Sequence, residues 1–295
     1  MKDNVGFYHV CTDGNAIPWL FQDDEDFIAG VNRIALCLLR VHIEVVAFIL
    51  MDNHIHFLLY GSALQCKKFI KHYKMLTGRW IAYKYGSREY LRMLPTEMIR
   101  IDDEENLLNV LAYIDRNSIA AGYKYLPHEY PWGSARYLFC DSRYGTRELA
   151  DLRSIDSMSV VEQRALFRTR MTLPGEWKVD RNGMIHPKSF MDLSRLEQIF
   201  KSPSRYSYFL AKKIEGHVEM QFTHARKVFM PDKELREIVR NMSRRLFGCE
   251  DVRELDVKSR IDIAKRLRYD YASTVKQISR MVIMFPFVWT GVKSS

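Results

Sequence analysis

Residues 42–60, HIEVVAFILMDNHIHFLLY, decide the fold of this 295-residue chain. Two apolar runs rich in β-branched and aromatic residues, 42–50 and 54–60, flank the short segment of Met51, Asp52 and Asn53. Runs of this length and composition predict strands, and so short a connection between them predicts an antiparallel hairpin.

Single strands and amphipathic helices alternate around this hairpin. In chain order we expect a strand at 5–11, a helix at 23–40, the two hairpin strands, a helix at 63–85, a strand at 97–101 and a helix at 104–121. This order predicts an α+β domain with a ferredoxin-like split antiparallel sheet and helices on one face. A doubly wound sheet would lack the hairpin.

Charge divides the chain unevenly. The net charge is +9, and residues 201–295 hold 20 Lys and Arg against 11 Asp and Glu, so the whole excess lies in the last third. We divide the chain into a first domain at 1–145, a linker or accessory region at 146–220 and a basic, mainly α-helical region at 221–295. A basic module attached to a neutral one suggests a polyanionic partner.

The basic region holds two short expected helices, 261–271 and 273–282, joined by a tight turn. This pattern resembles the start of a helix-turn-helix that binds DNA, although a plain helical cap is the alternative. The candidate phosphate contacts are Arg266, Arg268, Lys276 and Arg280.

Other features predict a soluble protein whose cysteines are reduced thiols. The five cysteines form no CxxC pair, which argues against a disulfide framework or a four-cysteine zinc site. No apolar run approaches the ~20 residues of a membrane helix, and the N-terminus lacks an apolar signal core. We therefore expect no membrane partner and a cytoplasmic location.

The tripeptide of His54, Ile55 and His56 is the most informative motif. Side chains alternate along a strand, so the two imidazoles face the same way and can share one metal ion. Two ligands leave the coordination incomplete, and Asn117 supplies a candidate amide oxygen from the helix at 104–121. Tyr113 lies four residues before Asn117, on the same helix face, and is a candidate nucleophile. Read alone, each of these residues is also compatible with ordinary packing.

Four motifs, in order, resemble one family. They are YHV (8–10) followed by Asp13, Gly14 and Asn15, then LMDNHIHFLL (50–59), AYIDRNSIAAG (112–122) and YPWGS (130–134). Together they resemble the single-tyrosine HUH transposases, in particular those associated with repetitive extragenic palindromes (REP).

The resemblance implies cleavage and joining of single-stranded DNA near hairpins. Tyr113 would form a 5′-phosphotyrosine, while His54, His56 and Asn117 would hold Mg²⁺ or Mn²⁺. Such a protein would be nucleoid-associated in a bacterial-type cytoplasm and act as a monomer or homodimer. The helix at 63–85 has a basic face that we expect to contact DNA phosphates, formed by Lys67, Lys68, Lys71 and Lys74.

The chain departs from the family pattern after the tyrosine. The usual NPxRAG reads here as Asn117, Ser118, Ile119, Ala120, Ala121 and Gly122, so the proline and the arginine are absent. If that arginine contacts DNA, affinity is weakened. The alternative function is a domesticated, non-catalytic DNA-binding regulator. The motif order argues against a third class, the relaxases and replication initiators.

Overall fold

The computed structural model describes residues 5–14, 20–86, 94–121, 123, 125–140, 152–212, 232–269, 273 and 275–282. Contacts divide the chain into two compact units, one of residues 1–117 and 125–222 and the other of residues 118–124 and 223–295. The boundaries expected after residues 145 and 220 remain predictions.

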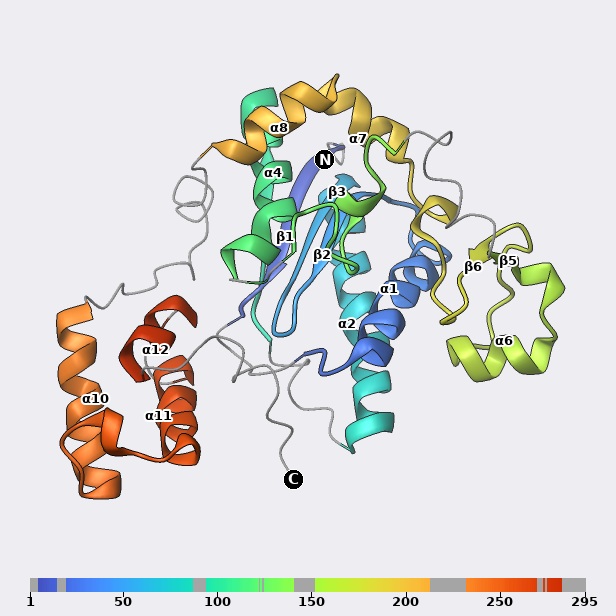
Figure 1. Cartoon of the computed structure of the whole chain (residues 1–295). Coiled ribbons are helices and arrows are strands. Elements are labelled where there is room, and N and C mark those ends of the chain that lie inside the picture. Colours follow the sequence, from blue (N-terminus) through green and yellow to red (C-terminus); the bar gives the residue numbers. More distant parts are fainter. Residues whose placement is uncertain are drawn as a thin grey trace. The chain divides into compact units, whose positions relative to one another are not determined.

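The first unit is built on a four-stranded antiparallel sheet (Figure 1). Its strands are β1 (Gly6–Thr12), β2 (Glu44–Leu50), β3 (Ile55–Gly61) and β4 (Thr96–Ile101), in the order β2-β3-β1-β4. The helices that follow β1, β3 and β4 are α1 (Asp24–Leu38), α2 (Ala63–Tyr85) and α4 (Glu104–Ala120). The α+β class, the hairpin and the split antiparallel order are thus confirmed.

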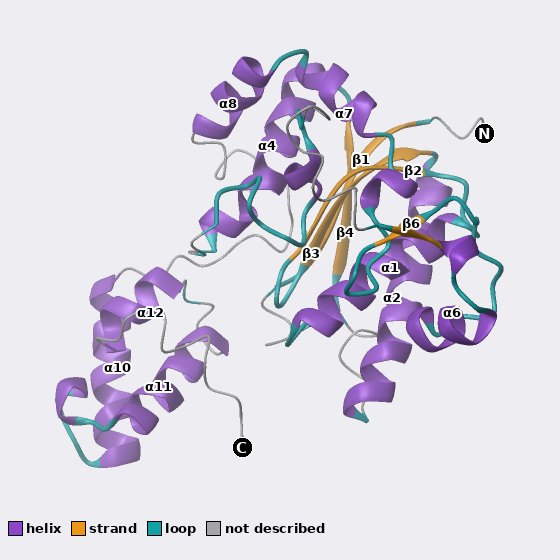
Figure 2. Cartoon of the chain, turned by 45° about the vertical axis from the view of Figure 1, so that its right-hand side comes forward, coloured by secondary structure: helices purple, strands orange, loops and turns teal. Residues whose placement is uncertain are grey.

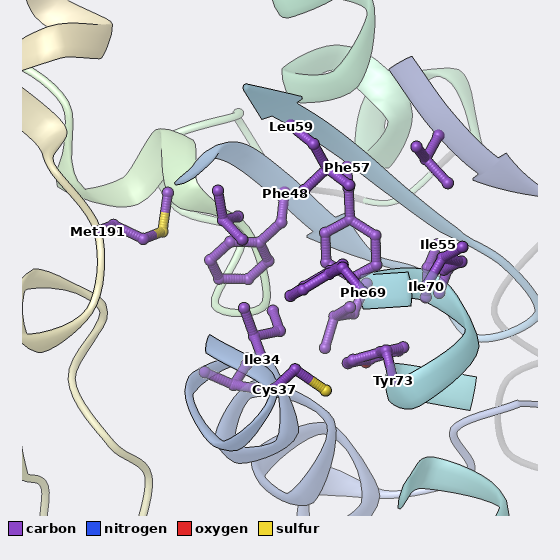
Figure 3. Close-up of a cluster of buried hydrophobic side chains, with 14 of the residues drawn as sticks. Ile34, Cys37, Phe48, Ile55, Phe57, Leu59, Phe69, Ile70, Tyr73 and Met191 are labelled. Atoms are coloured by element: carbon purple, nitrogen blue, oxygen red, sulfur yellow. The ribbon is translucent and has the colours of Figure 1, made fainter. Parts of the chain in front are cut away.

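One face of the sheet packs on α1 and α2. Phe57 of β3 is fully buried and contacts the rings of Phe69 and Tyr73 on α2 edge-on, at centroid distances of 5.4 and 5.1 Å. Ile34 and Cys37 of α1 join the same cluster (Figure 3). The alternation of the strands sends every second side chain of β1 and β3 into this core.

The other face of the sheet is covered too, which corrects the expectation of helices on one face only. His9 of β1 and His56 of β3 point away from the α1–α2 core, and both contact Tyr113 of α4. Figures 1 and 2 show α4 on the opposite side of the sheet from α1 and α2. The physical reason is the alternation itself, because the sheet buries both sets of side chains and each set needs a cover.

Local signals fix the ends of α2. Ser62 and Gln65 form a reciprocal capping box at its start, and Gly86 ends it in the left-handed region with φ 77°. These caps set the helix at the bounds that the sequence predicts.

The segment after α4 returns to the edge strand β2. Tyr130 donates its hydroxyl to the carbonyl of Leu50 at 2.8 Å, and the Ser134 hydroxyl accepts from the amide of Phe48 at 3.0 Å. Gly133 forms an isolated antiparallel bridge with Ile49. The YPWGS motif therefore caps the free edge of the sheet.

Residues 152–212 pack as part of the first unit. They form β5 (Arg153–Ser154), α6 (Val160–Phe167), β6 (Lys178–Val179), α7 (Leu193–Phe200) and α8 (Pro203–Ala211). Asn32 of α1 anchors the turn after β6, since its side chain bonds the carbonyl of Gly183 and the amide of Ile185. Tyr206 of α8 bonds Asp115 of α4.

Among the described residues of the second unit, three α-helices surround an apolar core. They are α10 (Asp232–Phe247), α11 (Val257–Tyr269) and α12 (Val275–Val282). Leu235, Ile263 and Ile278 are buried at the centre. The two helices expected at 261–271 and 273–282 correspond to α11 and α12.

Within the described part of the chain, no helix is long and apolar enough to cross a membrane. All five cysteines are free thiols.

Candidate metal centre and nucleophile

The fold brings the four residues expected at the centre together. His54 precedes β3 directly, and its ring lies 5.0 Å from that of His56 between centroids. Asn117 Oδ1 lies 3.2 Å from His54 Nε2, and the Tyr113 ring lies 5.5 Å from that of His56. Residues from the hairpin and from α4 therefore form one cluster on the α4 face of the sheet.

Two side-chain amides fix the orientation around His54. Asn53 Nδ2 donates to the carbonyl of Gly14 at 2.6 Å, so Asn53 Oδ1 faces His54 Nδ1 at 2.7 Å. Because an amide oxygen only accepts, His54 Nδ1 carries the hydrogen in this arrangement. The neutral His54 ring then has its lone pair on Nε2.

Asn117 presents a second acceptor to that lone pair. Its Nδ2 donates to the backbone carbonyl of Tyr113 at 2.8 Å, which turns Oδ1 toward His54 Nε2. Two acceptors 3.2 Å apart repel each other unless a positive charge lies at them. Either a second proton on His54 or a metal ion supplies it.

His56 is the most deeply buried member of the cluster. Its Nδ1 lies 3.1 Å from His9 Nε2, and no hydrogen bond reaches its buried Nε2 from the described residues. Burial, followed by the neighbouring His54 and His9, holds the pKa of His56 well below its usual value, although Asn117 opposes the fall. Burial also lowers the pKa of His9 to about 3. Both imidazoles are therefore neutral near pH 7, which is the form that binds a metal.

The donor set fits a divalent cation of mixed nitrogen and oxygen preference. Two imidazoles and one amide oxygen leave several coordination positions for water or phosphate oxygens. The described residues contain no group of three or more His, Cys, Asp and Glu arranged to hold a metal ion. The candidate centre has a different composition, because its third donor is an amide.

Tyr113 of α4 lies beside this cluster and faces the sheet. Its ring contacts His9 and His56 edge-on, at centroid distances of 6.0 and 5.5 Å. The side chain is half-buried, so part of it reaches solvent. A substrate phosphate at the cation position would thus lie near a tyrosine hydroxyl.

The expected DNA contacts are placed differently. Lys67, Lys68 and Lys71 are exposed on α2, but α2 covers the sheet face opposite the histidines. Lys74 is half-buried, and its Nζ donates to the Leu94 carbonyl and the Thr96 hydroxyl at 2.5 and 3.1 Å. Burial also lowers its pKa. Lys74 therefore anchors the chain at the start of β4, and its role as a phosphate contact stays a prediction.

The second unit holds the remaining candidates. Arg266 is exposed, whereas Arg280 pairs with Asp232 at 3.1 Å. The side chains of Arg268 and Lys276 lie outside the described part of the structure.

Three residues at the centre were not expected from the sequence as site residues: His9, Asn53 and Gly14. His9 is part of YHV, and its position on β1 became informative only once β1 was known to pair with β3. Gly14 allows close approach, since a Cβ there would lie 2.9 Å from His54 Nδ1.

Comparison of the chain with protein-family models, with curated proteins and with solved structures found no match.

Proposed function

We propose that the protein is a metal-dependent single-stranded DNA endonuclease and strand transferase of the single-tyrosine HUH type. The observation that supports this most is the convergence of His54, His56 and Asn117 beside Tyr113. A cluster of metal-ligating groups next to a half-buried tyrosine is what phosphoryl transfer by a tyrosine requires.

His54, His56 and Asn117 would hold the Mg²⁺ or Mn²⁺ ion. When bound, such an ion polarises a phosphoryl oxygen and stabilises the charge that develops during attack. Asn117 has a second role, because its bond to the Tyr113 carbonyl couples the ligand amide to the turn of α4 that carries the nucleophile.

The reaction exchanges one phosphodiester linkage for another, so it needs no external energy source. The Tyr113 oxygen loses its proton and attacks the scissile phosphorus, and the bond from phosphorus to the 3′ oxygen breaks. The 3′ oxygen takes up a proton and leaves as a 3′-hydroxyl, while the 5′ phosphate stays on Tyr113. Attack by a 3′-hydroxyl on this 5′-phosphotyrosine reverses the step and joins strands without a nucleotide cofactor.

The substrate is single-stranded DNA that carries a hairpin. The net charge of +9 supports a nucleic-acid partner. The exposed lysines of α2, together with Arg266, Arg268, Lys276 and Arg280 of the second unit, are the candidate phosphate contacts.

The test is covalent capture. Hairpin DNA from sequence flanking the gene is incubated with the full chain and Mn²⁺ or Mg²⁺, and denaturing gels reveal any protein–DNA adduct. We expect a metal-dependent adduct that is absent in Tyr113→Phe and His56→Ala and present in Tyr125→Phe, a change at an exposed tyrosine. An adduct that survives Tyr113→Phe would refute the assignment of the nucleophile.

Binding of the hairpin with no adduct under either metal would support the alternative, a domesticated non-catalytic regulator. The missing proline and arginine after Asn117 are the feature of this chain that favours it.

A further inference from the structure

We infer that His9 and Asn53 are positioning residues that hold the Nδ1 atoms of His56 and His54, so that both Nε2 lone pairs face the metal. This inference rests on the proposed role of the two histidines as ligands. It adds two residues that touch neither metal nor DNA and that act through the ligands.

Asn53 sets His54. The Asn53 amide cannot flip without losing its 2.6 Å bond to the Gly14 carbonyl. Its oxygen therefore stays 2.7 Å from His54 Nδ1 and requires a hydrogen there. Gly14 closes this side of the ring, because a Cβ at Gly14 would collide with His54 Nδ1.

His9, on the neighbouring strand β1, influences which ring nitrogen of His56 carries the hydrogen. The pair of His56 Nδ1 and His9 Nε2 at 3.1 Å has two arrangements, with the hydrogen on one nitrogen or on the other. When His9 donates, His56 carries its own hydrogen on Nε2 and cannot bind a metal. When His56 donates, Nε2 presents its lone pair, so a metal selects the arrangement in which His9 accepts.

The two contacts are equivalent in chemistry although they come from different elements. Each ligand histidine uses Nδ1 for an acceptor fixed by the protein and keeps Nε2 for the centre. Asn117 Oδ1 lies 3.2 Å from His54 Nε2, so two acceptors meet in a largely buried site, and the His56 ring lies 5.0 Å from that of His54 between centroids. A cation there relieves a repulsion that the fold has already built in.

Metal affinity of the full chain without DNA tests the inference. Free Mn²⁺ is measured by electron paramagnetic resonance during titration of wild type and variants. We expect His9→Leu and Asn53→Leu each to weaken binding by about 10- to 100-fold. His9→Gln keeps an acceptor at the same place and should retain most of the affinity. His128→Leu, a change at an exposed histidine, is the matched control.

Tautomers provide a readout that a purely structural role would not move. Long-range ¹⁵N–¹H correlation spectra of histidine-labelled, Mg²⁺-saturated protein distinguish a hydrogen on Nδ1 from one on Nε2. We expect Nδ1–H for both His54 and His56, and loss of this preference at His54 in Asn53→Leu. A hydrogen on Nε2 of either ring in wild type would overturn the inference.

The outcomes separate the two proposals. If wild type binds no Mn²⁺, the metal role in the proposed function fails. If wild type binds and His56→Ala abolishes binding, while folded His9→Leu and Asn53→Leu bind like wild type, only the positioning inference fails. If the leucine variants do not fold, the wild-type tautomers and the His9→Gln variant decide the question.

Discussion

Asp115 should make the stability of the first unit depend on pH in a direction opposite to that of an ordinary paired carboxylate. Asp115 is 1% exposed on α4, and Tyr206 of α8 donates its hydroxyl to Oδ2 at 2.9 Å. The other oxygen, Oδ1, has no hydrogen bond from the described residues. Burial dominates over the Tyr206 bond and raises the pKa of Asp115 from 3.8 to about 7.

The sign and size follow from linkage. Between the two pKa values the folded state holds a proton that the unfolded chain has lost, so stability is highest in acid and falls as the pH rises. Each pH unit in this window corresponds to ~1.4 kcal/mol. The free energy of unfolding should therefore fall by about 4 kcal/mol between the pKa of 3.8 and the pKa of about 7.

Replacement by asparagine removes this dependence. Asp115→Asn keeps an acceptor for Tyr206, but its amide hydrogens lack a partner, which costs about 1–3 kcal/mol. We expect the variant to be less stable than wild type at pH 4 and more stable at pH 8, so the two stability curves cross.

Urea denaturation followed by near-ultraviolet circular dichroism from pH 4 to pH 8 measures this effect. Asp102→Asn, a change at a side chain 73% exposed, is the control. A constant difference between wild type and Asp115→Asn across this range would refute the reasoning, since it would mean that Asp115 does not hold its proton in the fold.

Three further changes test other parts of the structure. Gly14→Ala places a methyl group 2.9 Å from His54 Nδ1, so we expect weaker Mn²⁺ binding at an unchanged thermal midpoint; unchanged affinity would show that the turn yields without moving the ring. Phe57→Ala empties a fully buried position between Phe69 and Tyr73 and should cost about 3–5 kcal/mol in urea denaturation. A cost below about 1 kcal/mol would contradict the packing described. Changing Lys67, Lys68 and Lys71 together to Gln should weaken single-stranded DNA binding and reduce the salt slope by up to ~0.7 per lost contact, without slowing adduct formation at saturating DNA. Lys74→Gln should leave that slope unchanged, because Lys74 Nζ is held by Leu94 and Thr96.

Much of the fold is local and could be predicted. The hairpin at 42–60 follows from two apolar runs and a short connection, and α2 follows from its capping box and its terminal glycine. The sequence also predicts that His54 and His56 share a face, because strand alternation needs no knowledge of the neighbours.

The expectation that all helices cover one face of the sheet was wrong, because the local sequence pattern does not show where a helix packs. Periodicity shows that α4 has an apolar stripe, but it does not say which face of the sheet the stripe covers. Lys74 shows the same limit of local pattern, since its helical position matches that of Lys67 and Lys71 and only the tertiary structure shows that its Nζ donates to Leu94 and Thr96.

The amino-acid sequence by itself determined the strands, the helices and the pair of histidines, because these depend on neighbours a few residues away. Only the tertiary structure decided what surrounds that pair. His9 lies 47 residues from His56, and Asn117 lies 63 residues from His54, yet each approaches within hydrogen-bond distance. Such contacts depend on strand order and on the face that α4 covers, and no local pattern encodes either.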